Sequence, residues 1–182
     1  MRRGLITLGI VLMLCMWTTT SSGLDAGFEE YRVKGAFLFN FLKYVEWTQS
    51  PVQDSLAPLI IVIYGEDPFG SQLDRDLDDR HIDSHPVKVV RIPQGDSIPD
   101  CHLVYTTLRD NNALEALLSD LRGVPVLTVG ESENFLSLGG VISLLLEDGK
   151  VRFDIDLDHA RRARIDISSK LLNLARQVRS DR

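Results

Sequence analysis

A continuous apolar run, Pro58–Tyr64, constrains the fold of this chain more than any other stretch. The residues after the proline are Leu-Ile-Ile-Val-Ile-Tyr, which include no polar position. Such a run is typical of a central strand covered on both faces, because a strand with one face in water alternates apolar with polar residues. We therefore expect a sheet with helices on both sides.

More strands and helices alternate along the chain after this run. Strands are predicted over 87–92, 103–106 and 124–129. One helix is predicted to begin at Pro68 with Asp67 as its cap, and another covers 111–121. Alternation of this kind indicates an α/β fold with a mostly parallel sheet.

The last third of the chain has a different pattern. Two apolar segments, 141–146 and 151–155, are separated by a turn centred on Asp148-Gly149, which predicts an antiparallel hairpin at the edge of the sheet with Asp154 facing out. Ser168 then caps a final predicted helix. This helix carries Leu171, Leu172, Ala175 and Val178. The expected fold is a single-domain layered α/β sandwich: a mixed, mostly parallel sheet with a C-terminal antiparallel hairpin and helices on both faces.

An amphipathic helix is predicted over 29–47, before the first strand. Lys34 falls inside its apolar arc, where it is either buried against a carboxylate, from Asp67 or the hairpin, or lies along the surface with its ammonium in water. Phe37 and Tyr44 lie on the shoulder of the polar face. They either pack under the linker that follows the helix or form an exposed apolar patch that marks an interface.

The N-terminus has the pattern of a secretory signal. Arg2 and Arg3 precede an apolar segment, Leu5–Trp17, and small polar residues follow it. The segment is short for a membrane span. We expect residues 1–23 to be a cleaved signal peptide and residues 24–182 to be one domain outside the cytoplasm, not itself membrane-spanning.

Cleavage would leave Cys101 as the one cysteine, since Cys15 lies in the signal segment. This thiol is buried and inert, reactive, or paired with another chain in an intermolecular disulfide. Without Arg2 and Arg3 the basic count falls from 20 to 18 against 26 acidic residues, a net charge of −8. So acidic a chain is a poor candidate for binding nucleic acid.

A search for catalytic and metal-binding patterns gives no complete constellation. The sequence Val129–Asn134 resembles a nucleophile elbow but lacks its second glycine, so Ser132 is interpreted as a helix cap. His81 and His85 lie in a charged segment ended by Pro86 and are interpreted as surface histidines, with zinc as the alternative. We expect no enzyme activity, no metal and no cofactor.

A series of motifs runs in order along most of the chain after the signal segment: Val33-Lys34, Ala36–Phe41, Val45–Trp47, Tyr64-Gly65, Asp67–Gly70, Cys101, Leu127–Val129, Phe135, Gly139–Ile142, Val151–Phe153, Ile167–Leu172 and Leu174-Ala175. This series resembles the motifs of the YfiR family of small periplasmic proteins.

The resemblance implies an α/β sandwich, a homodimer, and a regulator that binds the periplasmic domain of a membrane diguanylate cyclase and keeps it inactive, which lowers cyclic di-GMP and biofilm formation. We expect Phe37, Tyr44 and Trp47 to form the partner-binding surface. One departure is that the family's founding member carries internal disulfides, which a chain with Cys101 alone cannot form.

The alternative function is a periplasmic small-molecule binding module coupled to another membrane receptor. Its pocket would lie at the carboxyl ends of the parallel strands, where open α/β sheets hold ligands. The residues expected to line this pocket are Asp67, Phe69, Phe135, Gly139 and Gly140.

Overall fold

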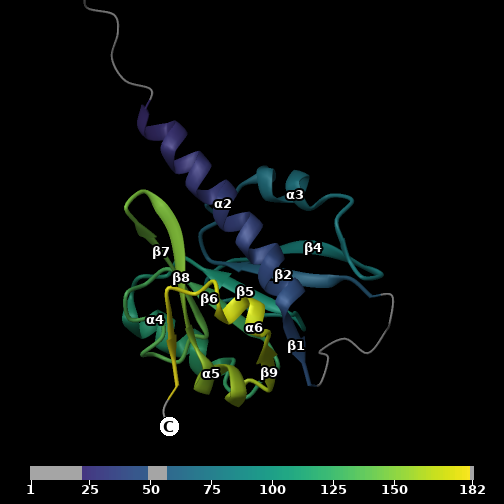
Figure 1. Cartoon of the computed structure of the whole chain (residues 1–182), viewed down its shortest axis with the longest axis vertical. Helices are drawn as coiled ribbons and strands as arrows, with labels where there is room; N and C mark the ends of the chain where they lie inside the picture. The colour runs from purple at the N-terminus through teal and green to yellow at the C-terminus, as the bar shows by residue number, and fades with distance from the viewer. Residues whose placement is uncertain (1–21, 49–56, 181–182) are drawn as a thin grey trace, which may run out of the picture.

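Residues 22–48 and 57–180 are described by a computed structural model of the chain (Figure 1). The predicted signal segment lies almost entirely outside the described residues. The elements in chain order are α2 (Ser22–Tyr44), β1 (Val45–Trp47), β2 (Leu59–Tyr64), α3 (Ser71–Leu77), β3 (His81–Ile82), β4 (His85–Ile92), β5 (Leu103–Thr106), α4 (Asn111–Asp120), β6 (Leu127–Gly130), β7 (Ile142–Glu147), β8 (Lys150–Asp156), α5 (Leu157–Arg162), β9 (Ile165–Ile167), α6 (Ser169–Leu172) and β10 (Gln177–Arg179).

An eight-stranded sheet forms the middle layer, in the order β10-β8-β7-β6-β5-β2-β4-β3. Strand β2 pairs in parallel with both β4 and β5, so the apolar run is central, as predicted. The strands β4-β2-β5-β6-β7 are all parallel and follow the doubly wound order 2-1-3-4-5. The hairpin β7-β8 is antiparallel. The predicted mixed α/β fold with one domain is confirmed.

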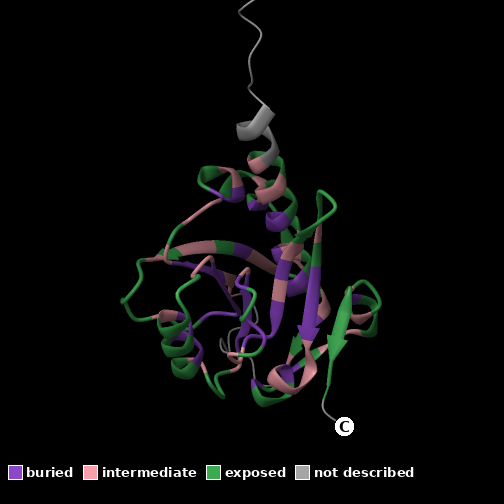
Figure 2. Cartoon of the chain, turned by 90° about the vertical axis from the view of Figure 1, so that its left-hand side faces the viewer, coloured by how far each residue is buried: buried purple, intermediate pink, exposed green. Residues whose placement is uncertain are grey.

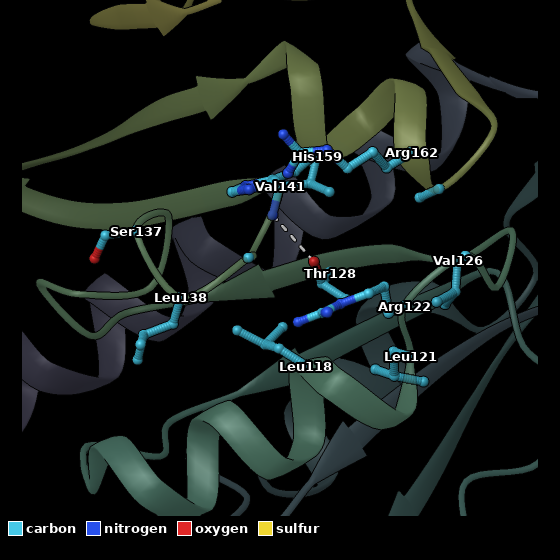
Figure 3. A pocket seen from close by; sticks show the side chains of 13 residues that line it. Leu118, Leu121, Arg122, Val126, Thr128, Ser137, Leu138, Val141, His159 and Arg162 are labelled. Atoms are coloured by element: carbon cyan, nitrogen blue, oxygen red, sulfur yellow. Dashed lines mark hydrogen bonds between the residues drawn. The ribbon is translucent and has the colours of Figure 1, made fainter.

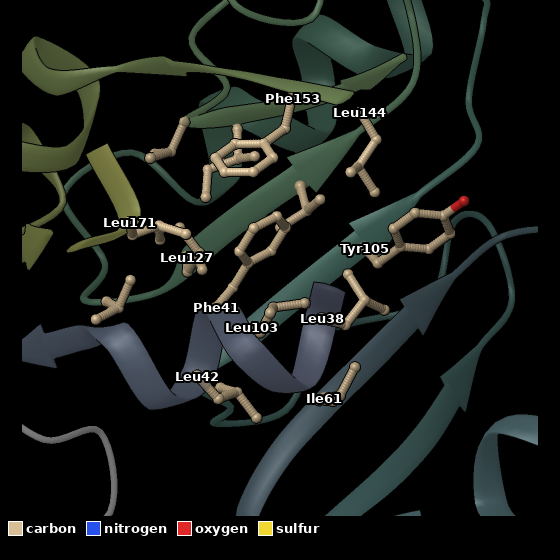
Figure 4. Packing of buried hydrophobic residues seen from close by; sticks show 14 of the residues in the cluster. Leu38, Phe41, Leu42, Ile61, Leu103, Tyr105, Leu127, Leu144, Phe153 and Leu171 are labelled. Carbon is tan, nitrogen blue, oxygen red and sulfur yellow. The ribbon is translucent and has the colours of Figure 1, made fainter. Parts of the chain in front are cut away.

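Successive residues of β2 enter two different cores, which explains why the whole strand is apolar. Ile61 and Ile63 face α2, whereas Val62 and Tyr64 face α4. On the α2 side, Leu38, Phe41 and Leu42 of the helix lie on the sheet and are 0 to 2 % exposed (Figure 4). Helix α2 therefore covers one face of the sheet and α4 covers the other (Figure 1).

The predicted helix over 29–47 is wrong at both ends. Helix α2 begins at Ser22 and ends at Tyr44, and the last three predicted residues form strand β1. Strand β1 pairs antiparallel with β9, with Val45 opposite Ile167 and Trp47 opposite Ile165. The β-branched and aromatic residues of this segment suit a strand, but the strand needs a partner from the far end of the chain, which helical periodicity does not reveal.

The C-terminal prediction also needs correction. Ser168 caps α6 by accepting a hydrogen bond from the Lys170 amide, but this helix is four residues long and Val178 lies in strand β10. Strand β10 pairs in parallel with β8 and is exposed along its length (Figure 2), so the hairpin is not the edge of the sheet. Asp154 does not face out: it is 4 % exposed, because the Arg176 guanidinium binds both of its carboxylate oxygens.

Two predicted caps differ from the structure. The Asp67 carboxylate accepts hydrogen bonds from the amides of Phe69 and Gly70, but α3 begins only at Ser71. Asp67 also pairs with Arg91 at 2.7 Å and therefore fixes a turn beside β4. Ser132 caps no helix, because the chain from 133 to 139 forms turns.

Phe135 determines the shape of the chain between β6 and β7. Its ring is 1 % exposed and lies between Gly130 and Gly140, where a Cβ atom added at either glycine would come within 3.0 Å of the ring. Gly139 has φ +118°, a conformation that favours glycine, and the next residues enter β7. The chain therefore turns at Gly139-Gly140 just before it enters the hairpin.

Candidate functional site

A buried ion-paired lysine lies at the carboxyl end of β6. The Lys34 ammonium is 2.5 Å from Glu30 Oε1, one turn earlier on α2, and 2.8 Å from Glu131 Oε2, directly after β6. Lys34 is only 2 % exposed, so the buried alternative is correct. The predicted carboxylates, Asp67 or one from the hairpin, are wrong, because α2 crosses the sheet above the end of β6.

Two tyrosines complete the environment of Glu131. The Tyr105 hydroxyl donates a hydrogen bond to one carboxylate oxygen, and the Tyr31 hydroxyl donates to the other at 3.5 Å. The Lys34 ammonium also lies 4.4 Å from the centre of the Tyr31 ring. We call these five residues, Glu30, Tyr31, Lys34, Tyr105 and Glu131, the Lys34 cluster.

In the Lys34 cluster, the lysine and both tyrosines keep their protons at neutral pH. Burial, and then the nearby Glu131 carboxylate, raise the pKa of Tyr31 and of Tyr105. Burial alone would lower the pKa of Lys34, but its hydrogen bonds to Glu131 and Glu30 outweigh burial and raise this pKa. The lysine therefore remains an ammonium and the tyrosines remain phenols, so none of the three supplies a general base or a nucleophile.

A hollow of about 490 Å³ opens beside this cluster, at the carboxyl ends of β5 and β6. We call it the strand-end hollow. Lys34, Glu30 and Glu131 line one side of it, Arg109 and Asn111 come from the segment after β5, and the hairpin residues Leu144, Leu145 and Leu146 close it. This end of a doubly wound sheet is where ligands usually bind.

The structure does not bring the five predicted pocket residues together. Phe69 lies on the α2 face of the sheet, 4.8 Å from the Tyr105 ring, whereas Phe135 lies on the α4 face. The Asp67 carboxylate forms an ion pair with the Arg91 guanidinium. None of the five lines the strand-end hollow, whose lining residues Lys34, Arg109 and Glu131 were not foreseen as a group.

The predicted partner-binding residues are half-buried. The Phe37 ring is 5.5 Å from Phe153 and 5.8 Å from Phe41, so much of it covers the core. The Trp47 ring packs 5.3 Å from His102, and its indole N–H has no hydrogen-bond partner among the described residues. Tyr44 is also packed against the core cluster on the α2 side.

Other apolar side chains near these residues are more exposed. Val33, one turn before Phe37 on α2, is 43 % exposed, and Leu146, at the tip of the hairpin, is 54 % exposed. In the sequence, Leu146 stands directly before the predicted hairpin turn. A side chain at the tip of a hairpin is not expected to be covered by a helix. We call Val33, Phe37 and Tyr44 the α2 shoulder.

The remaining candidate residues are placed as follows. Cys101 is 4 % exposed, and burial, followed by the charge of Asp100, raises the pKa of its thiol to about 12. His81 is exposed, whereas His85 is partly buried with its Nδ1 2.8 Å from the carbonyl oxygen of Ala57. In the part of the chain that the structure describes, no three His, Cys, Asp or Glu side chains are grouped to hold a metal ion.

The fold and this site define a single α/β sandwich domain whose strand-end cluster is a fixed charge network. A profile of the YfiR/HmsC-like family matches residues 31–176, and the chain therefore belongs to this family. None of the helices within 22–48 and 57–180 combines the length and apolar character that a membrane crossing requires.

One solved structure shows the same fold. It is the crystal structure of a conserved domain protein from Vibrio cholerae O1 biovar eltor strain N16961, which is similar with a TM-score of 0.50 and 16 % identity. The match covers 82 % of this chain and 60 % of the Vibrio chain. This chain thus spans less than two thirds of that protein, and the similarity concerns the fold alone.

Proposed function

We propose that this protein is a periplasmic regulator that binds the periplasmic sensor domain of an inner-membrane diguanylate cyclase and inhibits it. Cyclic di-GMP signalling and biofilm formation fall as a result. The observation that carries this proposal is membership of the YfiR/HmsC-like family over residues 31–176. The signal-like pattern of residues 1–23 supports export to the periplasm.

The Lys34 cluster supports a binding role rather than a catalytic one. Its lysine and tyrosines hold their protons, and its ion pairs fix α2 on the sheet. A helix held rigidly in this way presents the same side chains in the free and bound states, which lowers the entropic cost of binding a partner. We place the partner on the α2 shoulder with Trp47, and a homodimer is the expected assembly.

The test is the cyclic di-GMP level of the native bacterium after deletion and restoration of the gene. Deletion is expected to raise the level and restoration to lower it again. A gene carrying Val33→Arg is expected to fail to restore repression, because it places a charge on the α2 shoulder. The matched control is Val124→Arg, since Val124 is 40 % exposed against 43 % for Val33 but lies beyond α4. An unchanged level after deletion under several growth conditions contradicts the proposal.

A second candidate function is a small-molecule binding module coupled to another membrane receptor. The strand-end hollow favours it, because about 490 Å³ at the carboxyl ends of parallel strands matches the size and place of ligand pockets in α/β proteins. A saturable rise in melting temperature with one compound of a periplasmic metabolite set, lost in Arg109→Ala, supports this function.

A further inference from the structure

A second hollow lies at the opposite end of the strands. It has a volume of about 420 Å³ and is bounded by the end of α4, the start of β6, the segment that leads into β7, and helix α5. Arg122 enters it from the segment after α4, and His159 and Arg162 enter it from α5 (Figure 3). We call this hollow the arginine pocket.

The charge of the arginine pocket is opposite to that of the chain. The protein carries 26 acidic residues against 20 basic ones, yet no carboxylate lines this pocket. Among the described residues neither Arg122 nor Arg162 has an ion-pair partner, whereas the neighbouring Arg161 is paired with Asp158 at 2.7 Å. Two unpaired guanidinium groups on facing walls produce a positive potential that attracts an anion.

The rest of the pocket is largely apolar. Leu118 and Leu121 of the α4 segment lie below the space, and Leu138 and Val141 extend its apolar wall (Figure 3). The three other polar side chains of the lining already have partners: the Thr128 hydroxyl accepts a hydrogen bond from the Val141 amide at 3.0 Å, the Ser137 hydroxyl donates to the Asn134 carbonyl oxygen at 2.9 Å, and His159 Nδ1 lies 3.0 Å from the Gly140 carbonyl oxygen. The pocket therefore combines an apolar surface with two guanidinium groups beside it.

We infer that the arginine pocket binds an amphipathic anion, a carboxylate that carries an apolar chain. The guanidinium of Arg122 or Arg162 matches the carboxylate with charge-assisted hydrogen bonds, and the leucines remove the apolar chain from water. A pocket of about 420 Å³ is large enough for such a molecule. This inference is argued from the lining of the arginine pocket and does not depend on the proposed regulation of a cyclase. The binding experiment can therefore fail without affecting that proposal, and the cyclic di-GMP experiment can fail without affecting this one.

The test is calorimetric titration of the exported protein with octanoate. Saturable binding of one octanoate is expected, with much weaker binding of octanol, which lacks the charge, and of acetate, which lacks the chain. Arg122→Gln and Arg162→Gln are each expected to weaken octanoate binding about tenfold, since a hydrogen bond to a charged group is removed. The matched control is Arg161→Gln, on the same helix but outside the pocket, and it should bind like the wild type.

Several results would overturn the inference. Equal affinity for octanol and octanoate in the wild-type protein shows that the guanidinium groups do not select the ligand, and this comparison needs no variant. Equal affinity for acetate and octanoate reduces the site to a general anion site. Octanoate affinity that is unchanged in the Arg122→Gln/Arg162→Gln double variant, with an unchanged urea midpoint, places the ligand elsewhere.

Discussion

The ammonium of Lys34 lies 2.8 Å from Glu131 Oε2, and this contact joins the helix on one face of the sheet to the residue that follows β6. Both side chains are largely removed from water, with 3 % and 10 % of their surfaces exposed. A buried ion pair of this kind stabilises the fold only while both members are present, since a lone buried charge has lost its hydration without compensation.

We therefore expect Lys34→Met to lower the free energy of unfolding by about 3–5 kcal/mol, because Glu131 is left buried with a charge. The double variant Lys34→Met/Glu131→Gln should regain much of this loss. Urea unfolding followed by circular dichroism measures both. The control is Arg32→Met, which breaks an exposed pair with Glu29 and should cost less than about 1 kcal/mol. If Lys34→Met and Arg32→Met lower the free energy of unfolding equally, the buried Lys34 ion pair stabilises the fold no more than an exposed one, and the prediction is wrong.

Gly140→Ala is expected to destabilise the protein by about 1–3 kcal/mol or more, because the added Cβ collides with the buried Phe135 ring. Gly27→Ala, in helix α2 with nothing within 4 Å of the added atom, should instead stabilise by about 0.5–1 kcal/mol. Thermal unfolding distinguishes the two. Partial recovery in Gly140→Ala/Phe135→Leu would assign the loss to the ring, whereas no recovery would contradict this explanation.

The burial of His102 leads us to expect that the free energy of unfolding depends on pH. Burial, followed by the nearby His85, lowers the pKa of His102 from 6.5 to about 4, and its Nδ1 accepts a hydrogen bond from the Ile60 amide, which protonation would remove. Between these pH values the unfolded chain binds a proton that the folded chain does not. The stability from this group is thus fully present above pH 6.5 and falls by about 3 kcal/mol as the pH falls to 4.

The measurement is the free energy of unfolding in urea at pH 7 and at pH 4.5 for the wild type and for His102→Gln, which keeps an acceptor on the side chain. The variant should lose less stability than the wild type over this interval, because protonated carboxylates affect both proteins alike. The same pH slope in both proteins would mean that His102 does not titrate as described.

The Cys101 thiol is expected to react slowly, because it is buried and its pKa is raised to about 12. Ellman's reagent at pH 8 should label the native protein far more slowly than the protein in urea. The intermolecular disulfide stays a prediction that this burial disfavours. A dimer that dissociates on reduction, or in Cys101→Ser, would restore it.

The sequence predicted best those elements whose pattern is local. The apolar run of β2, the strand at Leu103–Thr106 and the Asp148-Gly149 hairpin all carry their periodicity or turn residues within a few positions, and the structure confirms them. Two of the errors concern β1 and β10, three-residue strands that exist because a distant strand pairs with them. Local patterns contain no information about such partners.

The candidate site was predictable only in part. The apolar arc left Lys34 either buried against a carboxylate or lying along the surface, and the structure shows the buried alternative. Its partner was not predictable, because Glu131 comes from a segment whose turns are set by the packing of Phe135 between two glycines. The two arginines and His159 of the arginine pocket show no common spacing in sequence, since the end of α4 and helix α5 meet only through the order of strands in the sheet.

The pairing of β1 with β9 has a consequence for the order of folding. Helix α2 leads directly into strand β1, whose partner, Ile165–Ile167, comes far later in the chain. The amide of Ser168 also binds the carbonyl oxygen of Tyr44, which closes the end of α2. Until those late residues arrive, the apolar stripe of α2 has no complete binding surface, so the chain cannot complete this part of its fold before they are made. Contacts this distant in sequence favour slow folding, and a chaperone that shields the helix would shorten the exposed interval.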